Sequence, residues 1–234
     1  MDLDKRIFII SSALALAGCG GSNGARGGSN GARIEATYRV RFINNWTQAN
    51  FPIQFPVNAH LTGMVGATHS EDIKFFDVGT MASIGVKDVA ETGKKDLMLN
   101  EVGREISRGF ADKALSGNGV NFGMTETTME FSIRSSHPRV TLISMLGPSP
   151  DWFTGVQGLL LYVDNSWVSN LDIPLKVYDS GTDDGRTFNS SNSASAPAKE
   201  VQLLNTADVD SDFTNGVKRL TGEYVARMIF EKLS

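Results

Sequence analysis

Apolar and polar residues alternate along several short stretches of the chain. Residues 38–43 and 129–134 each place apolar side chains at every second position, which is typical of a β-strand with one buried face. Short apolar runs bounded by Gly, Pro, Asn, Asp or Ser follow at 140–146, 158–163, 173–178 and 201–204. Because these bounding residues favour turns and no regular strand–helix alternation occurs, the pattern predicts a mainly β protein, an antiparallel β-sandwich.

Two stretches have the spacing of a helix instead. Residues 95–115 place apolar side chains four apart, although Gly103 and Gly109 weaken a helix there. Residues 217–233 place apolar side chains on one helical face: Leu220, Tyr224, Met228 and Ile229. We therefore expect one or two accessory helices, the second of them at the C-terminus.

The first residues predict export. Lys5 and Arg6 precede an apolar segment, 7–17, that is too short to span a bilayer comfortably and ends in small residues, as in a secretory signal peptide. Leu16-Ala17-Gly18-Cys19 resembles the lipobox of bacterial lipoproteins, which implies cleavage after residue 18 and lipidation of Cys19. Cys19 is the single cysteine, so the folded domain contains no internal disulfide.

A flexible tether is expected between the anchor and the domain. GGSNGAR occurs twice within residues 19–35, and Gly/Ser-rich sequence behaves as a flexible coil. Gly20 stands where an Asp would be the inner-membrane retention signal, so the lipoprotein resemblance implies an outer-membrane lipoprotein facing the periplasm or the exterior. Residues 36–234 remain as one domain with its C-terminal helix.

Composition excludes some functions. Hydrophobic residues make up 41 % and charged residues 21 % of the chain, and the net charge is −4, values that are ordinary for a globular protein. Since no basic stripe is present, nucleic acid is not an expected partner. No second apolar stretch is long enough to cross a membrane.

Three aspartates are candidates for a metal site. The runs 158–163 and 171–178 are joined by a short turn, so we expect antiparallel neighbouring strands. Asp151 precedes the first strand, and Asp179 and Asp183 follow the second, so all three should meet at one rim. Clustered carboxylates repel unless a cation lies among them, and calcium binds six to eight oxygens. The alternative is that these residues are Asx-turn and capping aspartates.

Two motifs in this order resemble the spondin domain, the N-terminal module of F-spondin and mindin: PSPDW within residues 145–162 and YDSGTD within 173–188. Matching pieces extend from about Tyr38 to Asn205. The resemblance implies an antiparallel β-sandwich with a role in extracellular adhesion and recognition and no enzymatic activity. It also implies calcium held by acidic residues on loops at one end, at the positions of Asp151, Asp179 and Asp183. Asp184 stands where relatives tend to have Ser, and the cysteines of animal members are missing here.

Two alternative functions remain open. His60, His69 and His137 could form the zinc site of a metal-dependent hydrolase, although they lack the close spacing of helix-borne zinc motifs. Trp152 and Trp167 flank the predicted metal rim and could stack on sugars in a glycan-binding module. The expected partners are thus the membrane, through Cys19, and a protein or glycan of the envelope or extracellular surface.

Overall fold

The computed structural model describes residues 34–204 and 224–234. The predicted signal peptide, Cys19 and nearly all of the predicted tether lie outside these ranges. The strands are β1 (Glu35–Asn44), β2 (His60–Leu61), β3 (Val65–His69), β4 (Ala111–Ser116), β5 (Glu126–Arg134), β6 (Arg139–Gly147), β7 (Trp152–Leu160), β8 (Tyr162–Val163), β9 (Ser166–Trp167), β10 (Asn170–Leu175), β11 (Val177–Asp179), β12 (Gln202–Leu203) and β13 (Ala226–Lys232); the helices are α1 (Ile84–Thr92) and α2 (Asp96–Ser107).

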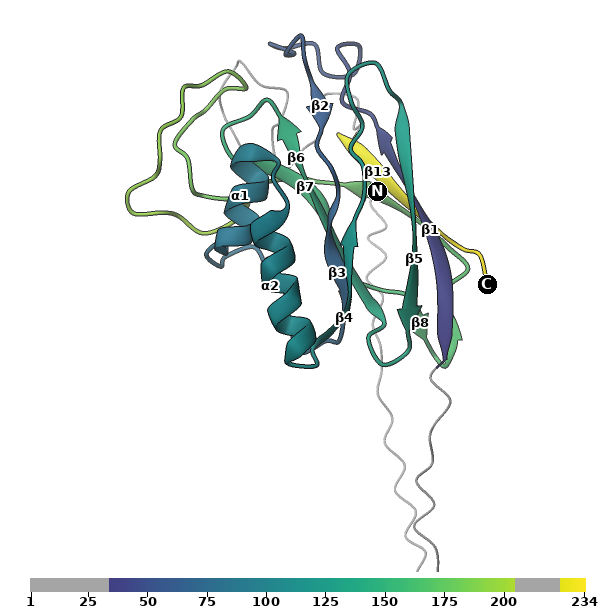
Figure 1. Cartoon of the computed structure of the whole chain (residues 1–234). Coiled ribbons are helices and arrows are strands. Elements are labelled where there is room, and N and C mark those ends of the chain that lie inside the picture. The colour runs from purple at the N-terminus through teal and green to yellow at the C-terminus, as the bar shows by residue number, and fades with distance from the viewer. Residues whose placement is uncertain (1–33, 205–223) are drawn as a thin grey trace, which may run out of the picture. The chain divides into compact units, whose positions relative to one another are not determined.

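Two antiparallel sheets form the body of the domain (Figure 1). The smaller sheet has the order β10-β13-β1-β5, and the larger has the order β12-β11-β7-β6-β3-β4, with β2 paired to β6. A short β8-β9 hairpin lies apart from both sheets. The prediction of a mainly β antiparallel sandwich is confirmed.

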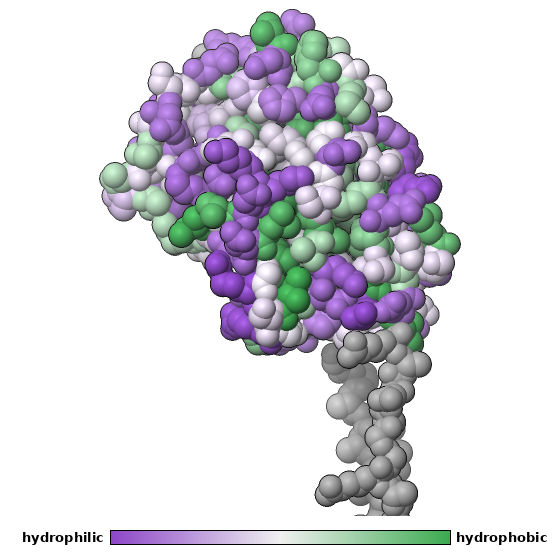
Figure 2. Space-filling model, viewed as in Figure 1, coloured by the Kyte–Doolittle hydropathy of each residue, from purple (hydrophilic) through white to green (hydrophobic). Residues whose placement is uncertain are grey.

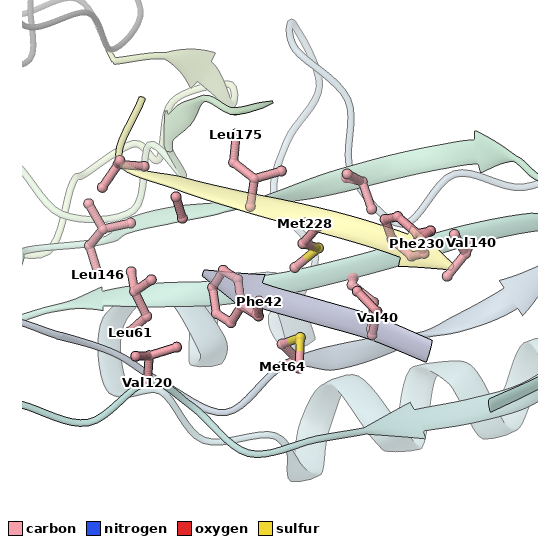
Figure 3. Close-up of a cluster of buried hydrophobic side chains, with 14 of the residues drawn as sticks. Val40, Phe42, Leu61, Met64, Val120, Val140, Leu146, Leu175, Met228 and Phe230 are labelled. Atoms are coloured by element: carbon pink, nitrogen blue, oxygen red, sulfur yellow. The ribbon is translucent and has the colours of Figure 1, made fainter. Parts of the chain in front are cut away.

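The core lies between the two sheets (Figure 3). Val40 and Phe42 of β1 and Phe230 of β13 belong to one buried cluster with Val140 and Leu146 of β6, and none of the five is exposed to solvent. The period-two pattern of β1 and β13 therefore directs one set of side chains into the core. Burial of this apolar surface is the main stabilising contribution.

The outer face of the smaller sheet is charged. Arg39 lies directly opposite Glu130 on β5, with 2.7 Å between guanidinium and carboxylate, and Arg41 pairs with Glu126 at the same distance. These are exposed or half-exposed cross-strand pairs, so each contributes little to stability. They explain why arginines alternate with apolar residues in residues 38–43.

The larger sheet is buried on both faces at its centre. Val140 and Leu142 of β6 point into the core between the sheets, whereas Ile143 packs with α1 and α2 on the outer face, beside Val86 and Met98. This double burial explains the continuous apolar run at 140–146. Among the described residues, neither helix is long and apolar enough to span a membrane.

One expected helix is present and shorter than predicted. α2 covers Asp96–Ser107, and the chain then turns through Gly109, whose φ of 82° is left-handed and favours glycine. The remainder of the predicted helix forms β4, from Ala111 to Ser116. A second helix, α1, was not expected from the apolar pattern.

The predicted C-terminal helix is wrong where the structure describes it. Residues 226–232 form β13, which lies between β1 and β10 in the smaller sheet. Ala226, Met228 and Phe230 are buried at alternate positions. Residues 217–223 of the predicted helix lie outside the described residues.

The predicted hairpin is also different from the structure. β10 pairs with β13 in the smaller sheet, and only β11 pairs with β7 in the larger sheet. The chain thus changes sheets at Lys176, whose carbonyl accepts a hydrogen bond from the Thr154 hydroxyl at 2.6 Å. The β11–β7 pairing still places Asp179 opposite Trp152, next to Asp151.

Candidate cation site at the apical loops

Several connecting loops gather at one end of the sandwich, the upper end in Figure 1, which we call the apical end. β1, β6 and β11 finish there, at Asn44, Gly147 and Asp179. The opposite, basal end contains Glu35, where β1 begins, paired in register with Arg134 of β5. The predicted carboxylates all lie at this apical end, Asp179 as the last residue of β11 and the other two on loops.

Asp151 lies in the short loop between β6 and β7. Pro148 and Pro150 restrict the backbone of this loop, and the Ser149 hydroxyl accepts a hydrogen bond from the Trp152 amide at 3.1 Å. The loop is therefore held closely against the start of β7. Its stiffness fixes the position of Asp151.

The Asp151 carboxylate is fully buried, with 0 % exposure. Its Oδ2 accepts hydrogen bonds from the Ser180 hydroxyl at 2.9 Å and from the amides of Thr182 at 2.7 Å and Asp183 at 3.1 Å. Its Oδ1 is buried and has no hydrogen-bond partner among the described residues. A buried carboxylate oxygen without a donor is costly, because burial removes the water that would solvate it.

Asp179 ends β11 and holds the next turn. Its Oδ1 accepts the Gly181 amide at 2.7 Å. Gly181 has a φ of 74°, and a Cβ there would lie 2.3 Å from the Lys199 carbonyl oxygen. Glycine is therefore required for the chain to turn and pass this close to Lys199.

Asp183 closes the longer loop that follows. Its Oδ1 accepts the Gly185 amide and its Oδ2 the Ser193 amide, both at 2.7 Å. Two distant points of the polar loop 181–198 are thereby joined. These are the Asx-type contacts of the alternative interpretation, and they engage both oxygens of Asp183, whereas Asp151 keeps one oxygen without a donor among the described residues.

The three carboxylates interact electrostatically. Burial raises the pKa of Asp151, and the negative charge of Asp183 adds to this rise, against the hydrogen bonds from Thr182 and Ser180. Burial and the neighbouring Asp151 raise the pKa of Asp179 to about 6. The site therefore holds negative charge that its own hydrogen bonds do not fully compensate.

The ligand geometry of a metal site is nevertheless incomplete. In residues 34–204 and 224–234, no group of three or more His, Cys, Asp and Glu side chains is placed so that it could hold a metal ion. The groups around Asp151 are all oxygen-bearing: the hydroxyls of Ser180 and Thr182 contact its Oδ2, and the Asp179 carboxylate interacts with it electrostatically. Hard cations such as calcium prefer oxygen donors.

Asp184 does not belong to the buried cluster. Its side chain is exposed and forms an ion pair with Lys199 at 2.5 Å and a hydrogen bond with the Ser195 hydroxyl at 2.7 Å. These partners lower the pKa of Asp184, the Lys199 contact most strongly. Asp184 is thus a surface charge beside the site.

The two tryptophans expected on a sugar-binding surface have different environments. Trp152 is 1 % exposed and packs edge-on against Phe188, which also contacts Trp46. This burial does not support the prediction that Trp152 binds a ligand, because its position at the start of β7 directs it into the core. Trp167 is half-buried against Tyr162 in the β8-β9 hairpin.

The three histidines do not converge on one site. His60 pairs with Gly147 at the apical end of β6, whereas His69 pairs with Arg139 at its basal end. His69 is buried and binds the Thr141 hydroxyl, while His137 binds the Gly109 carbonyl oxygen. The zinc-hydrolase interpretation is therefore not supported by their placement.

Ser180, Thr182 and Phe188 are site residues that the sequence interpretation missed. Ser180 and Thr182 supply the donors to Asp151, and Phe188 packs between Trp152 and Trp46. The YDSGTD motif contains both hydroxyl residues, which are potential partners of a buried carboxylate. No local pattern indicates the burial of Phe188.

A family model, Spondin_N, matches residues 36–217. Spondin-2 from Homo sapiens is 33 % identical over 182 residues, which cover 75 % of this chain and 54 % of that protein. Spondin-1 from Gallus gallus is 30 % identical over 206 residues, which cover 85 % of this chain and 26 % of that protein. The chain thus spans about half the length of spondin-2 and about a quarter of spondin-1.

Proposed function

The chain belongs to the Spondin_N family, and from this premise we propose that it is a non-enzymatic, calcium-binding module for extracytoplasmic adhesion and recognition. The curated relatives are spondins, and the resemblance of the acidic loops implies calcium at Asp151, Asp179 and Asp183. The calcium, the anchor and the adhesive role are each proposals for this chain.

The observation that supports calcium best is the unsatisfied Oδ1 of Asp151. A buried, charged oxygen without a donor is rare in folded proteins, and a cation is one of its ordinary explanations. The second carboxylate, Asp179, has a raised pKa of about 6 because of burial and Asp151. A bound cation would favour the charged form of both groups.

Asp151 and Asp179 would hold the ion, and further oxygens of the 180–183 turn and water would complete its sphere. Calcium binds such mixed sets of carboxylate, carbonyl and water oxygens. When bound, the ion supplies the positive charge that compensates these carboxylates. Asp183 keeps the loop closed through Gly185 and Ser193, so the ion and Asp183 together would order the apical loops for contact with a partner.

The test is thermal unfolding with and without calcium. An ion that binds only the folded state raises the free energy of unfolding by about 2.7 kcal/mol at a hundredfold excess over its dissociation constant. For a domain of this size, that increase corresponds to a rise in Tm of about 5–10 °C. We expect this rise with millimolar calcium and a smaller one with magnesium.

Variants identify the site. Asp179→Ala should abolish the calcium-dependent rise in Tm, and so should Asp151→Asn, which keeps an acceptor for the three donors while removing the charge. Asp184→Ala is the matched control, because it removes an exposed aspartate of the same loop, and it should keep the full rise. An unchanged melting curve of the wild-type protein in millimolar calcium would refute the calcium proposal.

We also propose that the protein is attached to the bacterial outer membrane through lipidated Cys19. The support is the sequence around this residue: an apolar segment, the Leu16–Cys19 motif and a Gly/Ser-rich tether. One acyl chain contributes about 0.8 kcal/mol per buried methylene, so several chains give stable attachment. The domain would then act at a distance from the bilayer.

A further inference from the structure

Two apical loops contain no charged residue. These are residues 45–59, between β1 and β2, and residues 117–125, between β4 and β5. In the chain as a whole, 21 % of residues are charged. We call the exposed residues of these two segments the uncharged surface.

Backbone hydrogen bonds join the second segment to the residues that flank the first. The Asn44 amide donates to the Thr125 carbonyl at 2.8 Å, and Leu61 and Val120 exchange two bonds at 3.0 and 2.9 Å. Both loops therefore lie side by side at the apical end (Figure 1). Hydrophobic atoms reach the solvent at this upper end in Figure 2.

Four large apolar side chains of the uncharged surface are exposed: Val57 by 88 %, Phe122 by 70 %, Met124 by 45 % and Ile53 by 38 %. Other residues anchor these loops in the core, chiefly Trp46, Phe51 and Val120, all at most 1 % exposed. Val57 and Phe122, the most exposed of the four, therefore contribute little to the buried core. Exposed apolar side chains gathered at one place mark interaction sites.

The loops are held in a defined shape. Pro52 and Pro56 restrict residues 45–59, and the Phe51 amide donates to the Thr47 carbonyl at 2.8 Å. In the second loop, the Met124 amide donates to the Asn121 carbonyl at 2.9 Å. A contact made by such loops loses little conformational entropy on binding.

The composition of this surface fits a protein contact better than a membrane contact. Protein interfaces are depleted of charge at their centre and enriched in aromatic residues and Met. Peripheral membrane binding gains from basic residues that attract anionic lipids, and the uncharged surface has none. A protein surface without charge is therefore the better match.

We propose that the partner is a second copy of this chain, bound apical end to apical end. In a two-fold symmetric contact, the same surface of both copies meets, so each group lies near its own counterpart. Charged groups would repel each other in such a contact, whereas apolar groups favour it. The exposed amides of Gln54, Asn58 and Asn121 each carry donors and an acceptor, so they pair with one another. The chain as a whole has a net charge of −4, so contacts between two copies through charged surfaces are opposed by repulsion.

The direction of β1 determines what this contact joins. Glu35 begins β1 at the basal end, and the ten-residue strand ends at Asn44, a span of about 30 Å. Two copies joined at their apical ends therefore have their Glu35 residues far apart and on opposite sides. This inference rests on the proposed adhesive function and names the partner in adhesion: another copy of the same chain, attached to an opposing surface.

The test uses beads that carry the full-length, unlipidated chain coupled through Cys19, the single cysteine. Wild-type beads should cluster with one another, because many weak contacts act together on a bead. In solution, the small contact area predicts only weak, concentration-dependent dimers in sedimentation experiments. Beads bearing the Val57→Asp/Phe122→Asp variant should cluster at least tenfold less.

The matched control is Met81→Asp/Ile84→Asp. Met81 and Ile84 are 56 % and 70 % exposed and lie outside the uncharged surface, so this variant makes the same chemical change elsewhere and should cluster like wild type. All four substitutions are at exposed positions, and an unchanged Tm confirms that each variant is folded.

The outcomes separate the proposals. Clustering that persists in the Val57→Asp/Phe122→Asp variant, or its absence from wild-type beads, overturns the second-copy contact. A third result would also overturn it: wild-type beads do not cluster, but the wild-type protein binds phosphatidylcholine vesicles and the variant does not. The surface would then contact lipid. If calcium raises the Tm but the beads do not cluster, the self-contact is overturned and the calcium proposal stands. If the beads cluster equally with and without calcium, the self-contact stands independently of the calcium proposal.

Discussion

At the scale of single residues, Asp151 is the most informative position. Three donors satisfy one of its oxygens, and the other is buried without a partner among the described residues. A purely structural aspartate in an Asx turn has no need of such burial. The hydrogen bonds around Asp183 show, in contrast, that the same loop also contains ordinary turn-forming aspartates.

Asp179 makes stability depend on pH when calcium is removed. Its pKa is about 6 in the folded protein against an ordinary 3.8, so between these values the folded state binds more protons than the unfolded state. The free energy of unfolding therefore falls as pH rises from about 4 to about 6. Thermal melts in EDTA across this range should show a declining Tm.

Asp179→Asn should make that decline shallower, because one of the two carboxylates with a raised pKa is gone while Asp151 remains. The control Asp184→Asn should keep it, since partners lower the pKa of Asp184 and its effect lies below this range. A decline of the same slope in Asp179→Asn would show that another group is responsible. In excess calcium the decline should weaken in the wild-type protein, because the ion binds the deprotonated form.

The sequence was sufficient to select these residues but not to describe their state. Asp151 and the YDSGTD motif could be identified from their order and chemistry. The burial of Trp152 and Phe188 could not, because it depends on loops that meet only after both sheets have formed. Sequence spacing alone does not distinguish a core tryptophan from a surface one.

At the scale of elements, the close approach of strands in the larger sheet limits which side chains fit there. Gly66 lies in β3, where a Cβ would be only 1.9 Å from the Thr141 carbonyl oxygen of β6. Gly103 lies in α2, and a Cβ there meets nothing within 4 Å. The two glycines therefore respond differently to the same substitution.

Gly66→Ala should lower the free energy of unfolding by about 1–3 kcal/mol, because the backbone of β6 must move. Gly103→Ala should raise it by about 0.8–1 kcal/mol, since alanine favours helix. Urea unfolding measures both. Equal effects of the two substitutions would contradict the close approach of β3 and β6.

The elements that were predicted correctly follow local rules. β1, β5 and β6 could be located from alternation and apolar runs. The helix predicted for 217–233 is wrong at 226–232, because a spacing of four residues, as between Tyr224 and Met228, is also an even spacing and fits a strand. Residues 226–232 form a strand because they pair with β1 and β10. Such long-range pairing leaves no pattern in the local sequence.

α1 could have been found from its ends. The Ser83 side chain accepts the Val86 amide at 3.1 Å, and Gly93 adopts a left-handed φ of 69° at the C-cap. Serine and glycine at these positions are strong start and stop signals. A second error, the single hairpin, has no such signal, because residues 171–178 read as one apolar run although the chain changes sheets at Lys176.

At the scale of the whole molecule, the proposed anchor and the apical loops belong to different parts of the chain. Cys19→Ala should move the exported protein from the detergent phase to the aqueous phase in a Triton X-114 partition experiment, because the acyl chains would be lost. The control Ser22→Ala should remain in the detergent phase. Retention of Cys19→Ala in detergent would refute lipidation at this residue.

The course of β1 has a mechanical consequence. This one strand leads from Glu35 directly into residues 45–59 of the uncharged surface. A pull between Glu35 and a partner held by that loop therefore runs along the covalent backbone of a single strand. The hydrogen bonds between strands are not placed in series with the force, so the domain should transmit tension without its sheets separating.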